Sequence, residues 1–288
     1  MLLNSKTIVY MNTKNILLSA SALLLSLSAY AERQVHIIDS PNLHCADTLV
    51  VYSPQAPVLQ RGIPTIFLLH GWSGDWKDWE SHTDLQAVSD RFGFRIICPD
   101  GFYDSWYINK TDETQMHWRD FFWEELWPFI EREYGLSPET TFIDGLSMGG
   151  HGAMNIFLDH PELFAGAGSM SGVLDLKYSA GSRELIPPML GVSDIEDPRC
   201  VAEGAVHRLE RLPQICGERA GDKLLVISCG TSDRSFIPAA EEFACKCQEM
   251  GLKYIALYSP GKHRWPYWTG ILPYHLEFFS EHLTGQAQ

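Results

Sequence analysis

The sequence predicts an α/β fold, with a mostly parallel central sheet of about eight strands and helices on both faces. The 288-residue chain alternates short apolar runs with amphipathic stretches, as expected of strands and helices that wind around a parallel sheet. The apolar runs are continuous and roughly four to seven residues long, which indicates strands buried on both faces. Hydrophobic residues make up 45% of the chain and charged residues 20%, so a full core can form.

The apolar runs are the predicted strands, and several of them end in glycine, proline or aspartate, where a turn begins. They cover 34–38, 47–52, 64–69, 94–98, 141–145, 165–170, 223–229 and 253–258. Stretches with apolar residues at helical spacing are the predicted helices, and Pro128 is expected to kink the first of them. They cover 118–134, 149–159, 237–250 and 270–283.

The length fits one large α/β domain with an insertion or two small domains. The regular alternation of strands and helices favours a single domain over residues 32–288. The segment 172–222 breaks this alternation and is rich in glycine, proline and charged residues. We interpret it as an insertion over the active edge of the sheet, and the sequence does not decide whether it moves as a lid.

The first 31 residues have the composition of an export signal. They contain two lysines and no acidic residue, an apolar run covers 16–25, and 29–31 (Ala-Tyr-Ala) supplies the small residues that a signal peptidase reads. The apolar run is too short for a comfortable membrane span. We therefore expect a periplasmic or secreted protein without a stable membrane anchor, made from Met1 or from Met11. The alternative is a signal that stays uncleaved as an N-terminal anchor.

Charge and cysteine content disfavour several classes of ligand. A formal net charge of −14 repels nucleic acid and anionic lipid and is compatible with a neutral substrate. Seven cysteines leave at least one thiol unpaired, and Cys200 with Cys216 is the best candidate disulfide. Cys245 and Cys247 would point to different faces of a helix, which argues against a shared metal ion. No cofactor or metal is expected, and the oligomeric state stays undetermined.

A G-x-S-x-G motif occupies 145–149 (Gly-Leu-Ser-Met-Gly), between a predicted strand and a predicted helix of small residues. The motif requires this context, because its glycines let strand and helix pass close together while the serine takes a strained backbone conformation. The turn lifts Ser147 above the sheet edge at a helix N-terminus, which favours negative charge. Ser147 is therefore the predicted nucleophile. The alternative is a serine in an ordinary glycine-rich turn.

A nucleophilic serine needs a general base, and the base needs an orienting acid. With this motif the expected chain order is serine, acid, histidine. His263 follows the last predicted strand and Asp233 follows the strand before it, so both lie at the carboxyl edge of the sheet, where ligands bind. They are the predicted base and acid, while Asp194 and Glu196 are rival acids that no strand precedes. The histidines on predicted helices are interpreted as surface or packed side chains: His151, His275 and His282.

Acyl transfer builds negative charge on a carbonyl oxygen, and backbone N–H groups must stabilise that charge. One such oxyanion-hole donor is expected from Met148, the residue after the nucleophile. The second is expected from the loop 70–74 (His-Gly-Trp-Ser-Gly) after the third predicted strand. Glycines there allow close approach to a substrate, and the Trp72 N–H is the best candidate. The alternative for this loop is a plain strand-ending turn.

Motif-bearing stretches occur along nearly all of the chain after the signal. They are LLHGWSGDWKDW (68–79), CPDGFYDSWY (98–107), GLSMGGHGAM (145–154), SMSG (169–172), CGTSD (229–233) and PGKHRWPYW (260–268). They resemble an esterase family of the α/β-hydrolase superfamily, which includes esterase D (S-formylglutathione hydrolase), tributyrin esterases, mycolyltransferases, and the feruloyl and acetylxylan esterases of carbohydrate esterase family 1. The resemblance implies the α/β-hydrolase fold without flavin, metal or nucleotide, and it implies a triad of Ser147, His263 and Asp233.

The resemblance also suggests which aromatic residues line the substrate pocket. Trp106 and Tyr107 lie in a loop after a predicted strand and are expected to bind the acyl or sugar part of a substrate, with loop packing as the alternative. Trp265, which follows the predicted base, is a further candidate. Lys262 and Arg264 flank the base where the family often has glycine and aspartate, so a basic pocket rim is expected.

These features together predict an exported serine esterase. Its substrate is expected to be a small-molecule or polysaccharide-linked carboxylic ester, such as an acetyl or feruloyl ester of plant polysaccharide. A general short-chain acyl esterase and an acyltransferase with the same triad are the alternatives. A binding protein on a hydrolase scaffold is disfavoured, because candidates for all three triad members are present.

Overall fold

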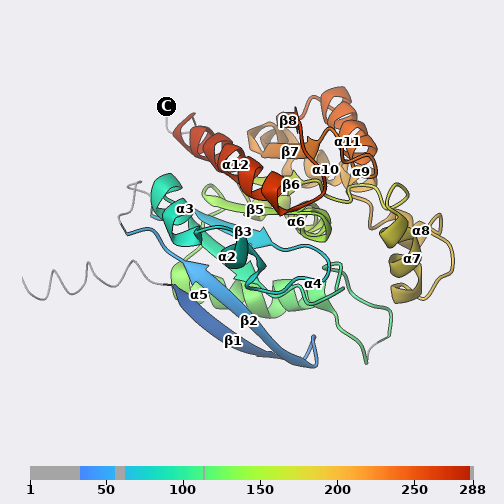
Figure 1. Cartoon of the computed structure of the whole chain (residues 1–288), viewed down its shortest axis with the longest axis horizontal. Coiled ribbons are helices and arrows are strands. Elements are labelled where there is room, and N and C mark those ends of the chain that lie inside the picture. The colour runs from blue at the N-terminus through green and yellow to red at the C-terminus, as the bar shows by residue number, and fades with distance from the viewer. Residues whose placement is uncertain (1–32, 56–61, 113, 286–288) are drawn as a thin grey trace, which may run out of the picture.

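A computed structural model describes residues 33–55, 62–112 and 114–285, and these residues contain an eight-stranded sheet (Figure 1). The strand order is β1-β2-β4-β3-β5-β6-β7-β8. Strands β3 to β8 pair in parallel, whereas β2 pairs antiparallel with both β1 and β4. The mostly parallel sheet that the sequence predicted is therefore confirmed. The strands are β1 (Gln34–Ser40), β2 (Cys45–Tyr52), β3 (Thr65–Leu69), β4 (Arg95–Pro99), β5 (Thr141–Gly145), β6 (Gly166–Met170), β7 (Leu224–Gly230) and β8 (Tyr254–Ser259).

Each predicted strand coincides with an observed one, shifted by at most two residues at either end. The continuous apolar runs mark strands with both faces covered, because β3 to β7 are buried along their whole length. Strand β1 lies at the edge of the sheet, and its side chains alternate between exposed and half-buried along most of its length. Central strands thus follow the pattern of a parallel sheet with helices on both sides.

Helices cover both faces of the sheet (Figure 1). Buried side chains of α4, α5, α6 and α11 pack on one face, and those of α3 and α12 pack on the other. The helices are α2 (Asp78–His82), α3 (Leu85–Phe92), α4 (Trp118–Phe121), α5 (Trp127–Tyr134), α6 (Met148–Asp159), α7 (Ala180–Met189), α8 (Pro198–Val201), α9 (Ala205–Arg208), α10 (Arg211–Cys216), α11 (Ile237–Glu249) and α12 (Trp265–Gly285), with short 3-10 segments η2 (Pro161–Leu163) and η3 (Gly217–Asp222).

The predicted helix 118–134 is continuous but not uniform. It begins as α4, passes through a π-helical segment, η1 (Phe122–Leu126), and ends as α5, whose second residue is Pro128. Proline has no N–H and its ring crowds the preceding turn, so the irregularity lies on its N-terminal side. A wide helical turn therefore precedes Pro128, and the kink itself stays a prediction.

The segment between β6 and β7 holds the short helices α7 to α10, where the sequence predicted an insertion. Charged side chains attach this segment to the body of the fold. Arg119 of α4 pairs with Glu203, and Arg208 of α9 pairs with Asp159 at the end of α6. The side chain of Ser179 accepts a backbone hydrogen bond from the first turn of α7, which stabilises the start of that helix.

The predicted disulfide between Cys200 and Cys216 is wrong, because both thiols are free. Burial raises the pKa of both thiols, so each stays protonated near neutral pH. Cys245 is exposed and Cys247 is buried on α11, as expected of different helix faces. The predicted signal, residues 1–31, lies outside the described residues. None of the helices in the described ranges is long and apolar enough to cross a membrane.

Candidate active site

Ser147 lies in the sharp turn between β5 and α6. Its backbone angles, φ 52° and ψ −117°, are strained for a residue with a side chain. The flanking glycines explain how the turn closes. A Cβ at Gly145 would lie 2.5 Å from the backbone of Gly149, and a Cβ at Gly149 would lie 2.4 Å from the Leu69 carbonyl oxygen. The Ser147 N–H donates to the Met170 carbonyl, so the turn is also tied to β6.

The side chains of Ser147, His263 and Asp233 meet from three separate loops. Ser147 Oγ lies 2.8 Å from His263 Nε2, and His263 Nδ1 lies 2.8 Å from Asp233 Oδ2. An ionised carboxylate can only accept, so Nδ1–H donates to it and Nε2 is left to accept the serine hydroxyl proton. The rival acids lie elsewhere, in the insertion, where Asp194 accepts a hydrogen bond from the Glu196 N–H.

Aromatic side chains hold the imidazole of His263. Phe236 stacks on it, with ring centroids 3.9 Å apart and planes 13° apart, and Trp268 meets it edge-on at 4.9 Å and 87°. The Phe236 N–H donates to the Asp233 carbonyl, so one loop fixes both the candidate acid and one face of the candidate base. Phe236 was not among the site residues predicted from the sequence, although an aromatic residue three positions after the predicted acid was a usable signal.

Both residues predicted to supply the oxyanion hole, Trp72 and Met148, lie beside Ser147. Met148 is the first residue of α6, and the first N–H groups of a helix have no partner within it. The Trp72 loop approaches the serine through Gly71, where an added Cβ would lie 3.5 Å from the Ser147 Cβ and 2.6 Å from a methyl carbon of Leu146. The missing side chain at Gly71 therefore permits this close approach.

His70 and Tyr107 support the Trp72 loop from inside the fold. His70 Nδ1–H donates to the Gly71 carbonyl at 2.8 Å, and Nε2 accepts from the Gly101 N–H at 2.7 Å. The Tyr107 hydroxyl donates to the His70 carbonyl at 2.9 Å. Tyr107 is 0% exposed, so the prediction that it contacts substrate is wrong and the alternative, loop packing, is correct.

A pocket of about 530 Å³ opens beside Ser147 and includes Trp106 in its wall, where the sequence placed it. The backbone φ of Trp106 is 53°, a left-handed conformation that is unusual for a bulky residue. The Trp72 side chain also lines the pocket and is 47% exposed. The remaining wall was not predicted from the sequence. It comes mostly from the insertion and the Asp233 loop and includes Val173, Ser179, Glu184, Leu185, Ser235 and Phe236.

Trp265 lies away from this pocket, so the prediction that it binds substrate is wrong. Its ring stacks on His82 at 3.9 Å with planes 3° apart, and it packs edge-on against Trp79 at 5.2 Å. Trp265 is the first residue of α12, and the helix start directs its side chain toward α2. Its partners there are ring surfaces, which accounts for an aromatic residue at this position.

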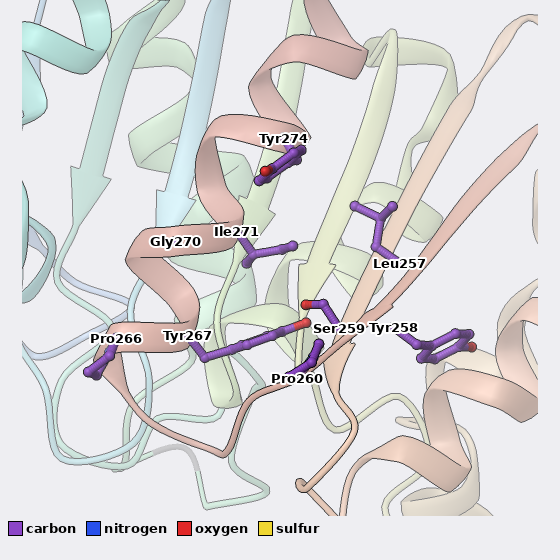
Figure 2. A pocket seen from close by; sticks show the side chains of 9 residues that line it. All are labelled: Leu257, Tyr258, Ser259, Pro260, Pro266, Tyr267, Gly270, Ile271 and Tyr274. Carbon is purple, nitrogen blue, oxygen red and sulfur yellow. The ribbon is translucent and has the colours of Figure 1, made fainter.

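Lys262 and Arg264 do not form a rim of the pocket either. They line a hollow of about 350 Å³, which shares Tyr267 with a hollow of about 450 Å³ between α12 and the end of β8. Figure 2 shows this larger hollow, with Tyr267 reaching from α12 toward Ser259. His263 lines the pocket beside Ser147, whereas its two neighbours line this separate, smaller hollow. The basic rim expected from the sequence is therefore absent from the described pocket wall.

The histidines on helices are packed side chains, as expected. His151 is wholly buried, with Nδ1 3.2 Å from the Val173 carbonyl, and burial lowers its pKa to about 4. Burial and the nearby Lys253 ammonium likewise lower the pKa of His282 to about 4.

In the ranges that the structure describes, no cluster of histidine, cysteine or acidic residues could hold a metal ion.

A family model, described as Putative esterase, matches residues 40–279. The chain belongs to this esterase family. The matched range includes Ser147, Asp233 and His263, and it covers the whole sheet except most of the first strand. Membership agrees with the family resemblance of the sequence motifs.

The curated relatives of this esterase-family protein include hydrolases and transferases of acyl groups. It is 30% identical over 129 residues to an acetyl esterase of Caldicellulosiruptor saccharolyticus, covering 44% of this chain and 48% of that protein. It is 26% identical over 242 residues to the diacylglycerol acyltransferase/mycolyltransferase Ag85A of Mycobacterium gordonae, covering 71% and 69%. The chain thus spans about half the length of the acetyl esterase.

Solved structures with a similar fold include two hydrolases of low sequence identity. A ferulic acid esterase matches with a TM-score of 0.70 at 20% identity, over 88% of this chain and 99% of that one. An S-formylglutathione hydrolase from Agrobacterium tumefaciens matches with a TM-score of 0.73 at 19% identity, over 87% and 95%. These matches establish the α/β-hydrolase fold of the chain.

Proposed function

We propose that this esterase-family protein is a serine esterase that hydrolyses carboxylic esters through an acyl-enzyme on Ser147. The observation that carries the proposal is the pair of 2.8 Å contacts that joins Ser147 Oγ to His263 Nε2 and His263 Nδ1 to Asp233 Oδ2. A nucleophile, a base and an orienting acid in this order are what acyl transfer requires. Membership of the esterase family supports the same chemistry.

In the first half of the reaction, Ser147 Oγ attacks the ester carbonyl carbon while His263 Nε2 accepts the hydroxyl proton. Asp233 holds the imidazole in the required tautomer and stabilises its positive charge. The N–H groups of Trp72 and Met148 stabilise the oxygen anion of the tetrahedral intermediate. His263 then gives the proton to the leaving alcohol oxygen as the C–O bond breaks, and the acyl group stays on Ser147.

In the second half, water takes the place of the alcohol. His263 Nε2 accepts a proton from the water as its oxygen attacks the acyl carbon, and the same N–H groups stabilise the second tetrahedral anion. Collapse of this intermediate breaks the bond to Ser147 Oγ, which recovers its proton from His263. The products are the free acid and the resting enzyme.

The substrates that fit best are acetyl and feruloyl esters of plant polysaccharide. A volume of about 530 Å³ is within the range of pockets that bind drug-sized ligands, so an aromatic acyl group of that size can enter. Aromatic side chains of Trp72, Trp106 and Phe236 contribute to the wall and suit a phenolic or sugar ring. The similar proteins include an acetyl esterase and a ferulic acid esterase. A short-chain esterase without polysaccharide specificity is the simpler alternative.

An acyltransferase is the second candidate function, and the match to the Ag85A mycolyltransferase of Mycobacterium gordonae favours it. A transferase would use the same acyl-enzyme but admit an alcohol in place of water in the second half. The two functions are distinguished by whether added alcohol acceptors compete with water for the acyl group.

We also propose that the protein is exported, because residues 1–31 have the composition of a signal.

The proposal is tested by hydrolysis of p-nitrophenyl acetate, p-nitrophenyl butyrate, methyl ferulate and acetylated xylan with the purified chain after the signal. Each assay is run beside the Ser147→Ala variant. Ser147-dependent release of ferulate or of acetate from xylan would support a carbohydrate esterase. Turnover of the nitrophenyl esters alone would leave a short-chain esterase, and no turnover in water but transfer to an added alcohol would favour the acyltransferase. No turnover or transfer at all would overturn the proposal.

A further inference from the structure

A second hydrogen-bonded set of serine, histidine and aspartate lies inside the fold. Asp144 Oδ2 lies 2.7 Å from His275 Nδ1, and His275 Nε2 lies 2.8 Å from Ser228 Oγ. All three residues are 0% exposed, and none lines the pocket beside Ser147. We refer to Asp144, His275 and Ser228 as the buried network.

Each member of the buried network lies on an element next to one member of the proposed triad. Asp144 lies on β5, three residues before the nucleophile. Ser228 lies on β7, five residues before the acid. His275 lies on α12, which begins two residues after the base. One histidine therefore joins the three elements that adjoin the loops of the proposed triad.

The chain leaves room for this network above β6, the strand that separates β5 from β7. A Cβ at Gly168 of β6 would lie 2.3 Å from the carboxyl carbon of Asp144, so only glycine lets the carboxylate occupy this space. Helix α12 crosses the same part of the sheet (Figure 1) and packs on this face, which brings His275 over the strand. Asp144 Oδ1 also accepts a hydrogen bond from the Gly145 N–H at 2.7 Å, at the end of β5 just before the turn that contains Ser147.

Burial of the three side chains strengthens these contacts. A buried polar group without a partner is costly, whereas a fully satisfied buried network rigidifies one arrangement of the elements that it joins. Here the aspartate, the histidine and the serine satisfy one another at distances of 2.7 Å and 2.8 Å. Any shift of β5, β7 or α12 relative to the others would stretch one of these contacts.

We propose that Asp144, His275 and Ser228 are positioning residues that hold the nucleophile, the acid and the base in register. The inference rests on the proposed function, because the triad is what the buried network positions. A displacement of about 1 Å at a reacting group can cost on the order of 10² in rate. Loosening the buried network therefore lowers kcat for a small ester and leaves KM nearly unchanged, because the pocket wall is not part of it.

The test compares two network variants, His275→Gln and Ser228→Ala, with matched controls. His282→Gln replaces another buried histidine of α12, and Ser89→Ala replaces a buried serine whose hydroxyl donates to the Phe94 carbonyl. With p-nitrophenyl acetate we expect kcat to fall by about 10-fold or more in the network variants. KM should change by less than about 2-fold in the same variants, and both controls should keep kcat within about 2-fold of the unmodified chain.

Thermal unfolding of all four variants shows whether loss of stability alone explains a loss of rate. The inference would be overturned if a control variant lost as much stability and as much kcat as the network variant that it matches. Any buried substitution would then have the same effect. Unchanged kcat in both network variants would overturn it as well. If His275→Gln does not fold, Ser228→Ala, which removes one hydroxyl group, decides the matter.

Crystal structures of Ser228→Ala and Ser89→Ala give a readout that does not depend on activity. We expect a contact from Ser147 Oγ to His263 Nε2, or from His263 Nδ1 to Asp233 Oδ2, to lengthen from 2.8 Å beyond hydrogen-bond range in Ser228→Ala alone. Unchanged contacts in Ser228→Ala would overturn the inference. If the unmodified chain neither hydrolyses an ester nor transfers its acyl group, the proposed function fails while these distances still test the buried network.

Discussion

The hydroxyl groups of Ser147 and Ser228 have hydrogen-bond partners of the same residue types, but their surroundings are very different. Each hydroxyl lies 2.8 Å from the Nε2 atom of a histidine whose Nδ1 contacts an aspartate. Ser147 is 9% exposed beside a pocket of about 530 Å³, whereas Ser228 is 0% exposed. Ser147 also occupies a strained turn at a helix start, with φ 52°, whereas Ser228 lies within the regular strand β7.

The difference predicts that hydrogen-bond geometry alone does not make a serine a nucleophile. A reacting serine also needs space for an ester and N–H groups that stabilise the developing charge. The turn at Ser147 supplies both, because it places the hydroxyl at the pocket and at the N-terminus of α6. In the buried network, the corresponding contacts join two strands and a helix, and we expect them to act by positioning the triad.

The largest expected effect separates the two serines directly. Ser147→Ala removes the proposed nucleophile and should lower kcat by on the order of 10⁵ to 10⁶. Ser228→Ala should lower it by only about 10-fold to 100-fold, since it acts through positioning. Steady-state hydrolysis of p-nitrophenyl acetate measures both. A loss in Ser228→Ala as large as that in Ser147→Ala would break the comparison.

The proposed base should behave as one unit with the nucleophile. His263→Ala should lower kcat nearly as much as Ser147→Ala, and the double variant should be no worse than either single one, because triad members act together. The measurement is kcat for all three proteins at saturating ester. Losses that multiply in the double variant would show that His263 acts independently of Ser147.

A smaller but still large effect is expected at the proposed acid. Asp233→Asn keeps the shape of the side chain but favours the wrong imidazole tautomer, and it should lower kcat by on the order of 10³ to 10⁴. Steady-state hydrolysis of p-nitrophenyl acetate checks the assignment, and KM should change little because Asp233 does not line the pocket. A rate within about 10-fold of the unmodified chain would point to a different orienting acid.

A modest effect is expected beneath the Trp72 loop. Tyr107→Phe removes the hydroxyl that donates to the His70 carbonyl at 2.9 Å. Loss of one hydrogen bond of this kind should lower kcat by about 3-fold to 10-fold, with KM unchanged. If KM rises steeply while kcat is retained, Tyr107 contacts the substrate after all, and its enclosed position would need another explanation.

The smallest effect concerns a buried histidine outside both sets. Burial lowers the pKa of His151 from 6.5 to about 4, so the unfolded chain binds more protons than the folded chain between these values. His151 therefore contributes a loss of stability as the pH falls from 6.5 toward 4. Thermal unfolding across this range should show a steeper fall for the unmodified chain than for His151→Gln. Parallel curves would contradict a neutral, buried His151.

The strands and the three proposed triad residues could be predicted because each depends on local pattern and chain order. Apolar runs identify strands covered on both faces, and the turn after each strand then lies at one edge of a parallel sheet. That reasoning placed Asp233 after β7 and His263 after β8, and the structure brings both within hydrogen-bond distance of one another. The catalytic roles themselves stay predictions until the variants are measured.

The remaining features depend on tertiary contacts that no local pattern encodes. His275 meets partners 131 and 47 residues away in sequence, so the periodicity of α12 identified it only as a packed or surface side chain. Tyr107 and Trp265 are aromatic residues near predicted site residues. However, Tyr107 packs inside the fold and Trp265 packs against α2. The pocket wall from α7 depends on how the insertion folds back, which composition does not reveal.

The central claim is that Ser147, and not Ser228, is the nucleophile, and covalent labelling tests it most directly. A fluorophosphonate reacts with an activated serine by forming an O–P bond and releasing fluoride, while the base accepts the hydroxyl proton. Peptide mapping by mass spectrometry then locates the adduct. We expect one adduct, on Ser147, that is absent from Ser147→Ala and from His263→Ala. Labelling of Ser228 or of another serine, or no labelling of a folded unmodified chain, would contradict the claim.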